Sequence, residues 1–184
     1  MFKRLVDDWV YGGFLAGLLL VALAPLFALV WPAGVFATWL QLPVYMMHQY
    51  EEHESDRFRR FINDHAAHGR EALGRVAVFV INVPGVWGVI ALATALAALL
   101  RPGLGLIAVY LVLVNALAHI GAAIALRRAN PGLVTAIILF LPAGFWGLAV
   151  LNGAGATAPD HAIGLAAALA IHAAIVVHVR RRMA

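Results

Sequence analysis

The sequence contains no cysteine and few charged residues. Without cysteine the chain can form neither disulfide bonds nor thiolate metal sites, so any bound metal must be held by histidine, carboxylate or amide groups. Only 12% of the residues are charged, 64% are hydrophobic, and the mean hydropathy is +0.90. Soluble globular domains have a much more polar composition. The chain is therefore expected to be surrounded largely by lipid.

Long hydrophobic runs account for most of the chain. A helix needs roughly 20 residues to cross a bilayer, and four almost uncharged stretches approach or exceed this length: residues 14–30, 76–100, 104–126 and 133–151. A fifth stretch, residues 161–179, is alanine-rich and contains His172. A sixth begins near Val35 and becomes polar at His48. The pattern predicts an all-α protein, a polytopic transmembrane bundle of about six helices.

The positions of Lys and Arg predict how this bundle is oriented. Cytoplasmic loops of membrane proteins are enriched in both residues. Basic residues precede the first span, separate the second from the third, join the fourth to the fifth and follow the sixth: Lys3, Arg4, Arg57, Arg59, Arg60, Arg70, Arg75, Arg127, Arg128, Arg180, Arg181 and Arg182. The opposite loops hold only Arg101. We therefore expect both termini in the cytoplasm, and one transmembrane domain, residues 1–184, with a polar cytoplasmic-side segment at about residues 48–75.

The basic character of the chain also bears on its partners. A sequence pI of about 10.1 is explained by this topology and by contact with anionic lipid headgroups, so nucleic-acid binding is not expected.

Gly13 and Gly17 form a small-residue face in the first span, of the kind through which membrane helices associate. A homo-oligomer formed through this face is one prediction.

The segment from His48 to His68 differs from the rest of the chain because it contains four of the eight histidines and most of the carboxylates. If the helix that begins near Val35 runs on, Glu51, Glu52, Ser55 and Asp56 lie on the same face as His48. His65 and His68, three residues apart, would form a second helical pair.

A histidine followed by carboxylates at three and four residues is an arrangement that a helix can offer to a divalent cation. The alternative is a charged membrane-exit segment in which Glu and Arg pair on a solvated face. We prefer a ligand or catalytic role for His48, Glu51 and Glu52, since such a cluster at a membrane edge is costly unless it is paired or metal-bound. The exit-segment interpretation is preferred for five other residues of the segment: His53, Glu54, Arg57, Arg59 and Arg60. Asp56 stays a secondary candidate for the site.

Polar residues in other predicted spans lie at a similar depth. Asn82, His119 and His172 are each seven or eight residues from a basic edge, close to the depth expected for His48, and Asn115 lies one turn from His119. Each of these has a simpler interpretation as an interhelical hydrogen bond, which fits His172 best. Tyr45 and Tyr50 flank the cluster and could donate hydrogen bonds to a carboxylate or ligand, although interfacial anchoring explains them nearly as well.

The pattern His48-Gln49-Tyr50-Glu51-Glu52 resembles the motif of the HXXEE family, small bacterial membrane proteins named for it. Further similarity lies in the stretch from Asn115 to His119 and in Asn130-Pro131-Gly132 with Thr135. The resemblance covers about Val44 to Trp146. It implies that His48, Glu51 and Glu52 are important, and a location in the bacterial cytoplasmic (inner) membrane, but it implies no reaction.

The leading functional hypothesis is a membrane-embedded metalloenzyme. Its expected ligands for one or two divalent ions are His48, Glu51, Glu52 and His119, with His65 or His68, and Glu51 and Glu52 are the expected catalytic residues. Iron or manganese would suit oxidation of a lipophilic substrate that enters from the lipid, while zinc would suit hydrolysis. The carboxylate-rich, thiolate-free ligand set slightly favours oxidative di-metal chemistry.

Two other classes stay open from the sequence. A cation or proton-coupled transporter could use the same His and Glu cluster to load and unload ions. A purely structural membrane subunit would use it for stability alone.

Overall fold

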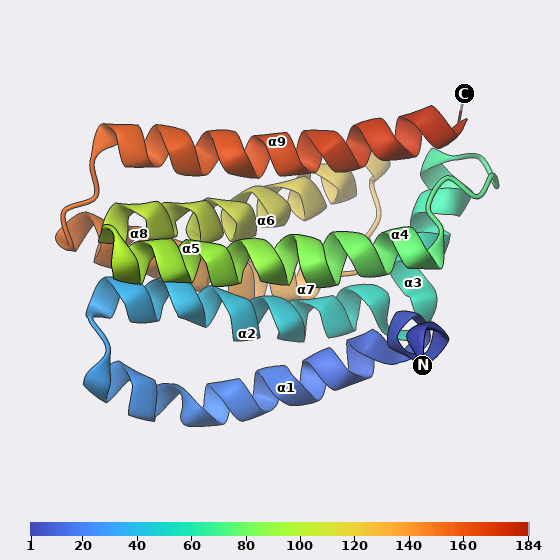
Figure 1. The fold of residues 1–184 in the computed structure, drawn as a ribbon. Helices are drawn as coiled ribbons and strands as arrows, with labels where there is room; N and C mark the ends of the chain where they lie inside the picture. Colours follow the sequence, from blue (N-terminus) through green and yellow to red (C-terminus); the bar gives the residue numbers. More distant parts are fainter. Residues whose placement is uncertain (184) are drawn as a thin grey trace.

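The computed structural model describes residues 1–183, and these residues form helices joined by short connections (Figure 1). The helical elements, in chain order, are α1 (Phe2–Val30), α2 (Ala33–His53), η1 (Glu54–Asp56), α3 (Arg57–Phe61), η2 (Ile62–Ala66), α4 (Arg75–Val80), η3 (Ile81–Trp87), α5 (Gly88–Leu99), η4 (Pro102–Gly105), α6 (Leu106–Leu126), α7 (Leu133–Thr135), η5 (Ala136–Phe140), α8 (Leu141–Gly153) and α9 (Ala158–Met183).

Several of these elements join end to end, so that the bundle consists of six long helices. Five are long and apolar enough to cross a membrane: Phe2–Val30, Arg75–Leu99, Pro102–Leu126, Leu133–Gly153 and Ala158–Met183. The sixth, α2, has 21 residues but carries the polar residues of the motif. The protein is thus a multi-pass membrane protein, and the predicted all-α bundle of about six helices is confirmed.

Helix α2 has a central place in the bundle (Figure 1). It packs against α1 on one side and against α5 and α8 on others, while α6 packs against α8 and α9. The core between them is apolar and includes Ile90, Leu111 and Phe140, each fully buried. Because α2 and α6 face each other across this core, polar side chains on the two helices can meet inside the bundle.

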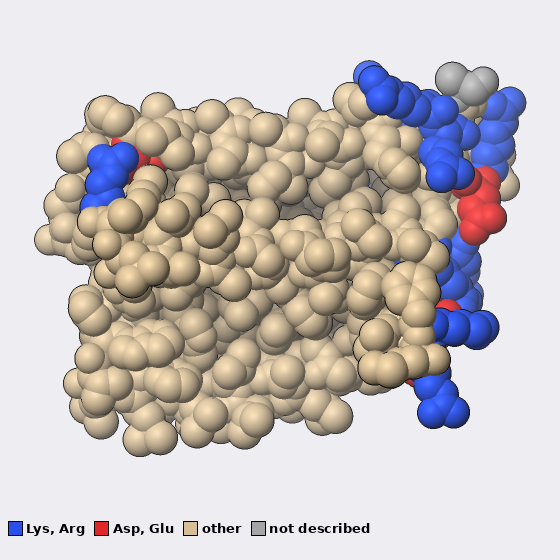
Figure 2. Space-filling view, in the orientation of Figure 1, with Lys and Arg blue, Asp and Glu red and all other residues tan. Residues whose placement is uncertain are grey.

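Charged side chains gather at the two ends of the bundle, with most at one end. Both chain termini lie at that end (Figure 1), where Figure 2 shows most of the Lys and Arg side chains of the visible face. At the opposite end Arg101 lies next to Asp160. The sides between the ends are apolar, with exposed residues such as Leu19, Leu92 and Leu169. The arrangement is that of a lipid-exposed bundle, and the cytoplasmic orientation of the basic end stays a prediction.

The first helix differs from the expected one in its start and in its packing. It begins at Phe2 rather than near residue 14, because its charged first turns extend beyond the apolar stretch. A Cβ atom at Gly13 would lie 2.8 Å from the Trp87 ring, and one at Gly17 would lie 3.0 Å from Cβ of Met46. The small-residue face of α1 therefore packs inside the chain, and it is not free to join a second copy.

The expectation that α2 runs on as far as Asp56 is wrong. The helix ends at His53, and Ser55 and Asp56 have φ values of 52° and 64°. Aspartate tolerates this left-handed conformation better than most residues because its short side chain can hydrogen-bond locally. The chain turns there, so Asp56 does not share a helical face with His48.

Candidate metal centre

Helices α2 and α6 bring three chemically active side chains together inside the bundle. His48, Glu52 and His119 are 0%, 5% and 6% exposed, and one ligand atom from each lies within 4.8 Å of the other two. His48 and Glu52 are one turn apart on α2, and His119 comes from α6. Nε2 of His48 is 3.5 Å from Oε2 of Glu52, and Nε2 of His119 is 3.5 Å from Oε1.

The tautomer of His119 follows from its contacts with Asn130. The Asn130 amide nitrogen donates to the His119 backbone carbonyl at 2.8 Å. Its amide oxygen lies 2.7 Å from Nδ1 of His119 and can only accept. Nδ1 therefore carries a proton, and in the neutral ring Nε2 presents its lone pair to Glu52.

His48 is fixed in the same way by Thr135. The Thr135 hydroxyl donates to Oε2 of Glu51 at 2.5 Å, and its oxygen lies 2.8 Å from Nδ1 of His48. Since the hydroxyl proton is already used, the oxygen accepts from Nδ1–H of His48. The neutral His48 ring likewise presents its Nε2 lone pair to Glu52, and within residues 1–183 that atom has no hydrogen-bond partner.

Glu51 and Glu52 are adjacent in sequence but have different surroundings. The Glu51 carboxylate accepts backbone N–H groups of Val134 at 3.2 Å and Thr135 at 2.7 Å, in addition to the Thr135 hydroxyl. It therefore satisfies free N–H groups at the start of the helix that begins at Leu133. Glu51 lies outside the three-residue group, and the geometry gives it contact with the residue that orients His48.

The loop before that helix closes one side of the group. Gly132 has a φ of +92°, and a Cβ atom there would lie 2.7 Å from Cε1 of His119 and 2.9 Å from Cε1 of His48. Only a glycine combines this backbone conformation with such close approach to two imidazole rings. On another side the Phe140 ring packs on His48 with centroids 4.0 Å apart.

Sequence reasoning gave no separate role to Asn130, Gly132 and Thr135, which appeared there only as part of the family resemblance. The signal that could have identified them is the Asn-Pro-Gly turn directly before a membrane span.

His53 was assigned to a solvated face, yet it is 6% exposed, and its Nε2 lies 3.0 Å from Oε2 of Glu52. The role of His53 was missed because His53 is five residues from His48, so helical geometry puts the two side chains on different faces of α2.

A cavity of about 440 Å³ borders the group. Its walls are mostly apolar and include Val86 and Leu111 of the core and Ile171 and Ile175 of α9. Glu52 and His119 form part of one wall, and Glu52 is the only carboxylate among the described lining residues. Figure 2 shows the lipid-facing surface hollowed between α9 and the α4–α5 helix. The group of His48, Glu52 and His119 is thus next to a space that a small lipophilic molecule could occupy.

Four other predicted polar residues line the same cavity: Tyr45, Asn82, Asn115 and His172. Asn115 donates to the Tyr45 hydroxyl at 2.7 Å, and Asn82 accepts from the Gln49 amide at 2.8 Å. Nδ1 of His172 contacts the carbonyl of Ala168 in its own helix at 2.8 Å. Of the residues for which the sequence predicted a shared depth, Asn82, His119 and His172 line this one cavity.

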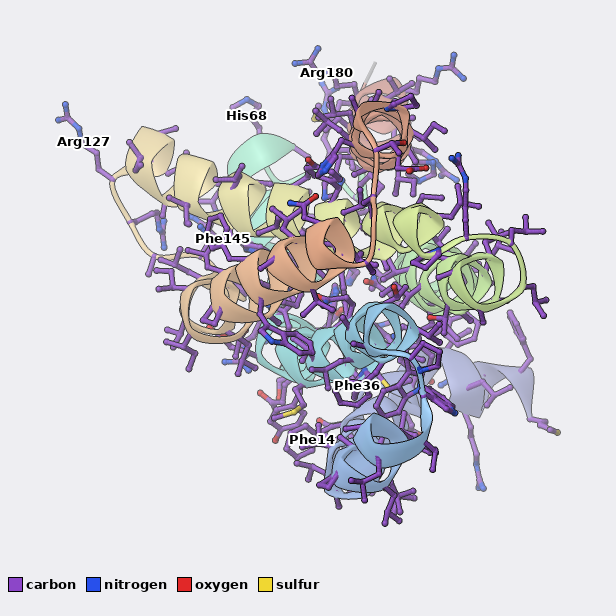
Figure 3. The ribbon with its side chains drawn as sticks, turned by 90° about the vertical axis from the view of Figure 1, so that its left-hand side faces the viewer. Phe14, Phe36, His68, Arg127, Phe145 and Arg180 are labelled. Carbon is purple, nitrogen blue, oxygen red and sulfur yellow. The ribbon has the colours of Figure 1, made fainter. Side chains whose placement is uncertain are left out.

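Three predicted residues lie outside the three-residue group. Tyr50 stacks on Phe14 with centroids 4.3 Å apart. His65 and His68 are exposed and do not belong to the three-residue group. His65 instead contacts the Phe61 carbonyl at 3.0 Å, and Figure 3 shows His68 at the margin of the bundle. The expected second histidine pair is not a part of this centre.

Asp56 belongs to the charged end of the bundle rather than to the centre. It pairs with Arg59 at 2.6 Å and lies 3.5 Å from Arg75. The hydrogen bond from Arg59 to Asp56 raises the pKa of the guanidinium further above its ordinary value. Asp56 therefore has a cationic partner of its own outside the spans.

The fold and this group of side chains define a multi-pass membrane protein with a buried His–Glu–His group that could hold a metal ion. The chain belongs to the HXXEE family, described as proteins of unknown function with an HXXEE motif. The family model matches residues 39–147, more than half of the chain, which confirms the resemblance seen in the sequence. No curated protein and no solved structure matches the chain. The function must therefore be argued from the site.

Proposed function

We propose that the protein is a membrane-embedded, metal-dependent enzyme in which His48, Glu52 and His119 hold one divalent ion. The observation that carries this proposal is the separation of 3.5 Å between the Glu52 oxygens and each histidine Nε2. That separation is too long for a good hydrogen bond. Two ligand atoms that are each about 2.1 Å from an ion in tetrahedral geometry lie roughly 3.4 Å apart.

The residues around the three ligands support the same assignment. Metal-binding histidines usually donate their other ring N–H to an oxygen acceptor, which fixes the tautomer and the ring plane. Asn130 and Thr135 supply such acceptors to His119 and His48. Glu51 was a candidate ligand, but we assign it the role of positioning His48. Its carboxylate accepts the Thr135 hydroxyl, and the oxygen of that hydroxyl orients the His48 ring.

Three protein ligands leave coordination positions open, and this favours a catalytic over a structural ion. Two histidines and one carboxylate hold iron in oxygen-activating enzymes and zinc in hydrolytic enzymes. Hydrolysis would require a separate base, but Glu52 is the only carboxylate among the described residues that line the cavity, and His53, the nearest other base, has its Nε2 3.0 Å from Glu52. We therefore favour oxidation of a lipophilic substrate, with iron as the metal and dioxygen as the oxidant. A single set of three ligands suits one ion rather than two.

The cavity supports an enzyme over a transporter. An ion pathway needs polar groups that continue across the membrane. At the opposite end the polar residues Arg101, Asp160 and His161 are engaged with one another or with neighbouring side chains. The space next to the ligands has mostly apolar walls, which suits a hydrocarbon substrate better than a hydrated cation.

The metal-to-protein ratio tests this proposal directly. We expect about one ion per chain in wild-type protein purified without chelators, and almost none in His48→Ala or His119→Ala. His172→Ala is the matched control, because His172 lines the same cavity but does not belong to the group. Inductively coupled plasma mass spectrometry gives both the ratio and the metal. Full metal content in the two ligand variants, or no binding of iron, manganese or zinc by the wild type, would contradict the proposal.

A further inference from the structure

Tyr45 and Asn115 form a polar pair next to the metal-binding group. Tyr45 precedes His48 by three residues on α2, and Asn115 precedes His119 by four on α6. Side chains at these spacings share a helical face. The pair therefore lies one turn, about 5 Å, along the bundle from the two histidines. Both residues line the cavity that Glu52 and His119 also border.

The pair has one hydrogen-bond donor and one acceptor left over. The Asn115 amide nitrogen donates to the Tyr45 oxygen at 2.7 Å, which leaves the Tyr45 hydroxyl proton without an acceptor among the described residues. The Asn115 amide oxygen is buried and has no partner within residues 1–183. Buried polar groups are normally satisfied, so this donor and this acceptor indicate a ligand group that would complete them.

We propose that this pair binds the hydroxyl group of a lipophilic alcohol. A hydroxyl can accept from the Tyr45 O–H and donate to the Asn115 amide oxygen at the same time. An ether or an ester carbonyl uses only the donor. A carboxylate cannot donate to Asn115 and would also place a second negative charge near Glu52. The apolar walls receive the hydrocarbon part, which makes the ligand an uncharged alcohol.

This inference rests on the proposed function, because it names the substrate class of the same site. The alcohol would bind with its hydroxyl at the Tyr45–Asn115 pair and with a carbon about one helical turn away facing the metal ligands. A free long-chain alcohol and a diacylglycerol carry the same hydroxyl chemistry. The cavity, at about 440 Å³, is of a size that small ligands fill, and we assign it to the single-chain alcohol.

Photocrosslinking tests the inference with the full chain in lipid nanodiscs. The probes are a long-chain primary alcohol with a mid-chain diazirine and the methyl ether of the same molecule. We expect the alcohol to label wild type more strongly than the ether does. Tyr45→Phe and Asn115→Leu should each reduce alcohol labelling by about two- to tenfold, which corresponds to one lost hydrogen bond. Competition by unlabelled 1-dodecanol should exceed competition by dioctanoylglycerol.

Tyr110→Phe is the matched control, since the Tyr110 hydroxyl contacts His161 at the opposite end of the bundle, and it should label like wild type. Equal labelling by alcohol and ether, unchanged labelling of Tyr45→Phe, or stronger competition by dioctanoylglycerol would overturn the inference. Tyr45→Phe removes a single oxygen, so it remains usable if Asn115→Leu fails to fold. Metal content measured on the same samples separates the two proposals: a wild type that binds the alcohol but no metal refutes the metal site alone.

Discussion

Two buried carboxylates lie at opposite ends of the bundle, and they differ in what surrounds them. Asp160 is 2% exposed at the start of α9. One of its oxygens accepts the Thr157 backbone N–H at 2.9 Å and the Thr157 hydroxyl at 2.7 Å. The other lies 2.9 Å from the Arg101 guanidinium. This is a helix cap with a cationic partner, and its charge is balanced within the chain.

Glu52 is buried to a similar degree, at 5% exposed, but its neighbours are imidazole rings. His48 and His119 each approach it at 3.5 Å, and His53 at 3.0 Å. The proton positions derived for His48 and His119 direct lone pairs rather than N–H groups toward the carboxylate. A buried carboxylate to which two of its three imidazole neighbours present lone pairs is costly, and a bound cation would offset that cost. Burial alone therefore does not identify a functional carboxylate, whereas the nature of its neighbours does.

The largest expected difference between the two carboxylates appears when each is replaced by its amide. Glu52→Gln should abolish metal binding, because a neutral amide is a poor ligand for a divalent ion. It should also raise the melting temperature of the metal-free protein, since an amide N–H can donate to a histidine lone pair and a buried charge is removed. Metal analysis and thermal unfolding in detergent measure the two effects.

The opposite pattern is expected for Asp160→Asn. This variant should lose about 1 kcal/mol of stability, the usual contribution of a helix cap, and should keep its metal. If Glu52→Gln destabilises the metal-free protein as Asp160→Asn does, the two carboxylates are both structural, and Glu52 has no functional role that Asp160 lacks.

Much of the fold could be predicted from the sequence because lipid imposes simple rules. Four nearly uncharged stretches were enough to predict four spans, and each corresponds to a helix long and apolar enough to cross a membrane. The end of α2 could not be predicted in this way. Ser55 and Asp56 are compatible with a continuing helix, and nothing in the local sequence announces their left-handed conformation or the contact of Asp56 with the distant Arg75.

The candidate site was accessible to sequence reasoning only in part. His48 and Glu52 are four residues apart, so helical geometry alone places them on one face. The approach of His119 depends on how α6 packs against α2, and depth in the membrane gave only an indirect indication of it. The different orientations of Glu51 and Glu52 depend on the loop at Gly132 and Thr135, whose path follows from contacts distant in sequence.

A smaller but still large effect is expected when the loop glycine gains a methyl group. Gly132→Ala would place its Cβ within 3 Å of both imidazole rings, and these rings would have to move. Metal sites tolerate displacements of only about 0.5 Å, so metal occupancy should fall to a small fraction of the wild-type value. Gly155→Ala is the matched control: φ is +88° there, and no atom lies within 4 Å of the added carbon.

Because both substitutions strain the backbone in a similar way, they should lower the melting temperature to a comparable extent through this strain. Only Gly132→Ala should lower metal occupancy. Equal occupancy in the two variants would mean that close packing of the loop on His48 and His119 does not matter for the centre.

The smallest effect is expected from removing one hydroxyl. Thr135→Val deletes the group that accepts from Nδ1 of His48 and donates to Glu51. Loss of such an outer contact typically weakens metal binding by about 10- to 100-fold, so the variant should bind metal at a higher free concentration than wild type. Thr94→Val is the control, since among the described residues the Thr94 hydroxyl bonds to the Ile90 carbonyl of its own helix alone. Competition with a chelator of known affinity measures the metal affinity of both variants. If Thr135→Val binds the metal as tightly as Thr94→Val does, Glu51 and Thr135 do not support the centre, and His48, Glu52 and His119 bind the ion without them.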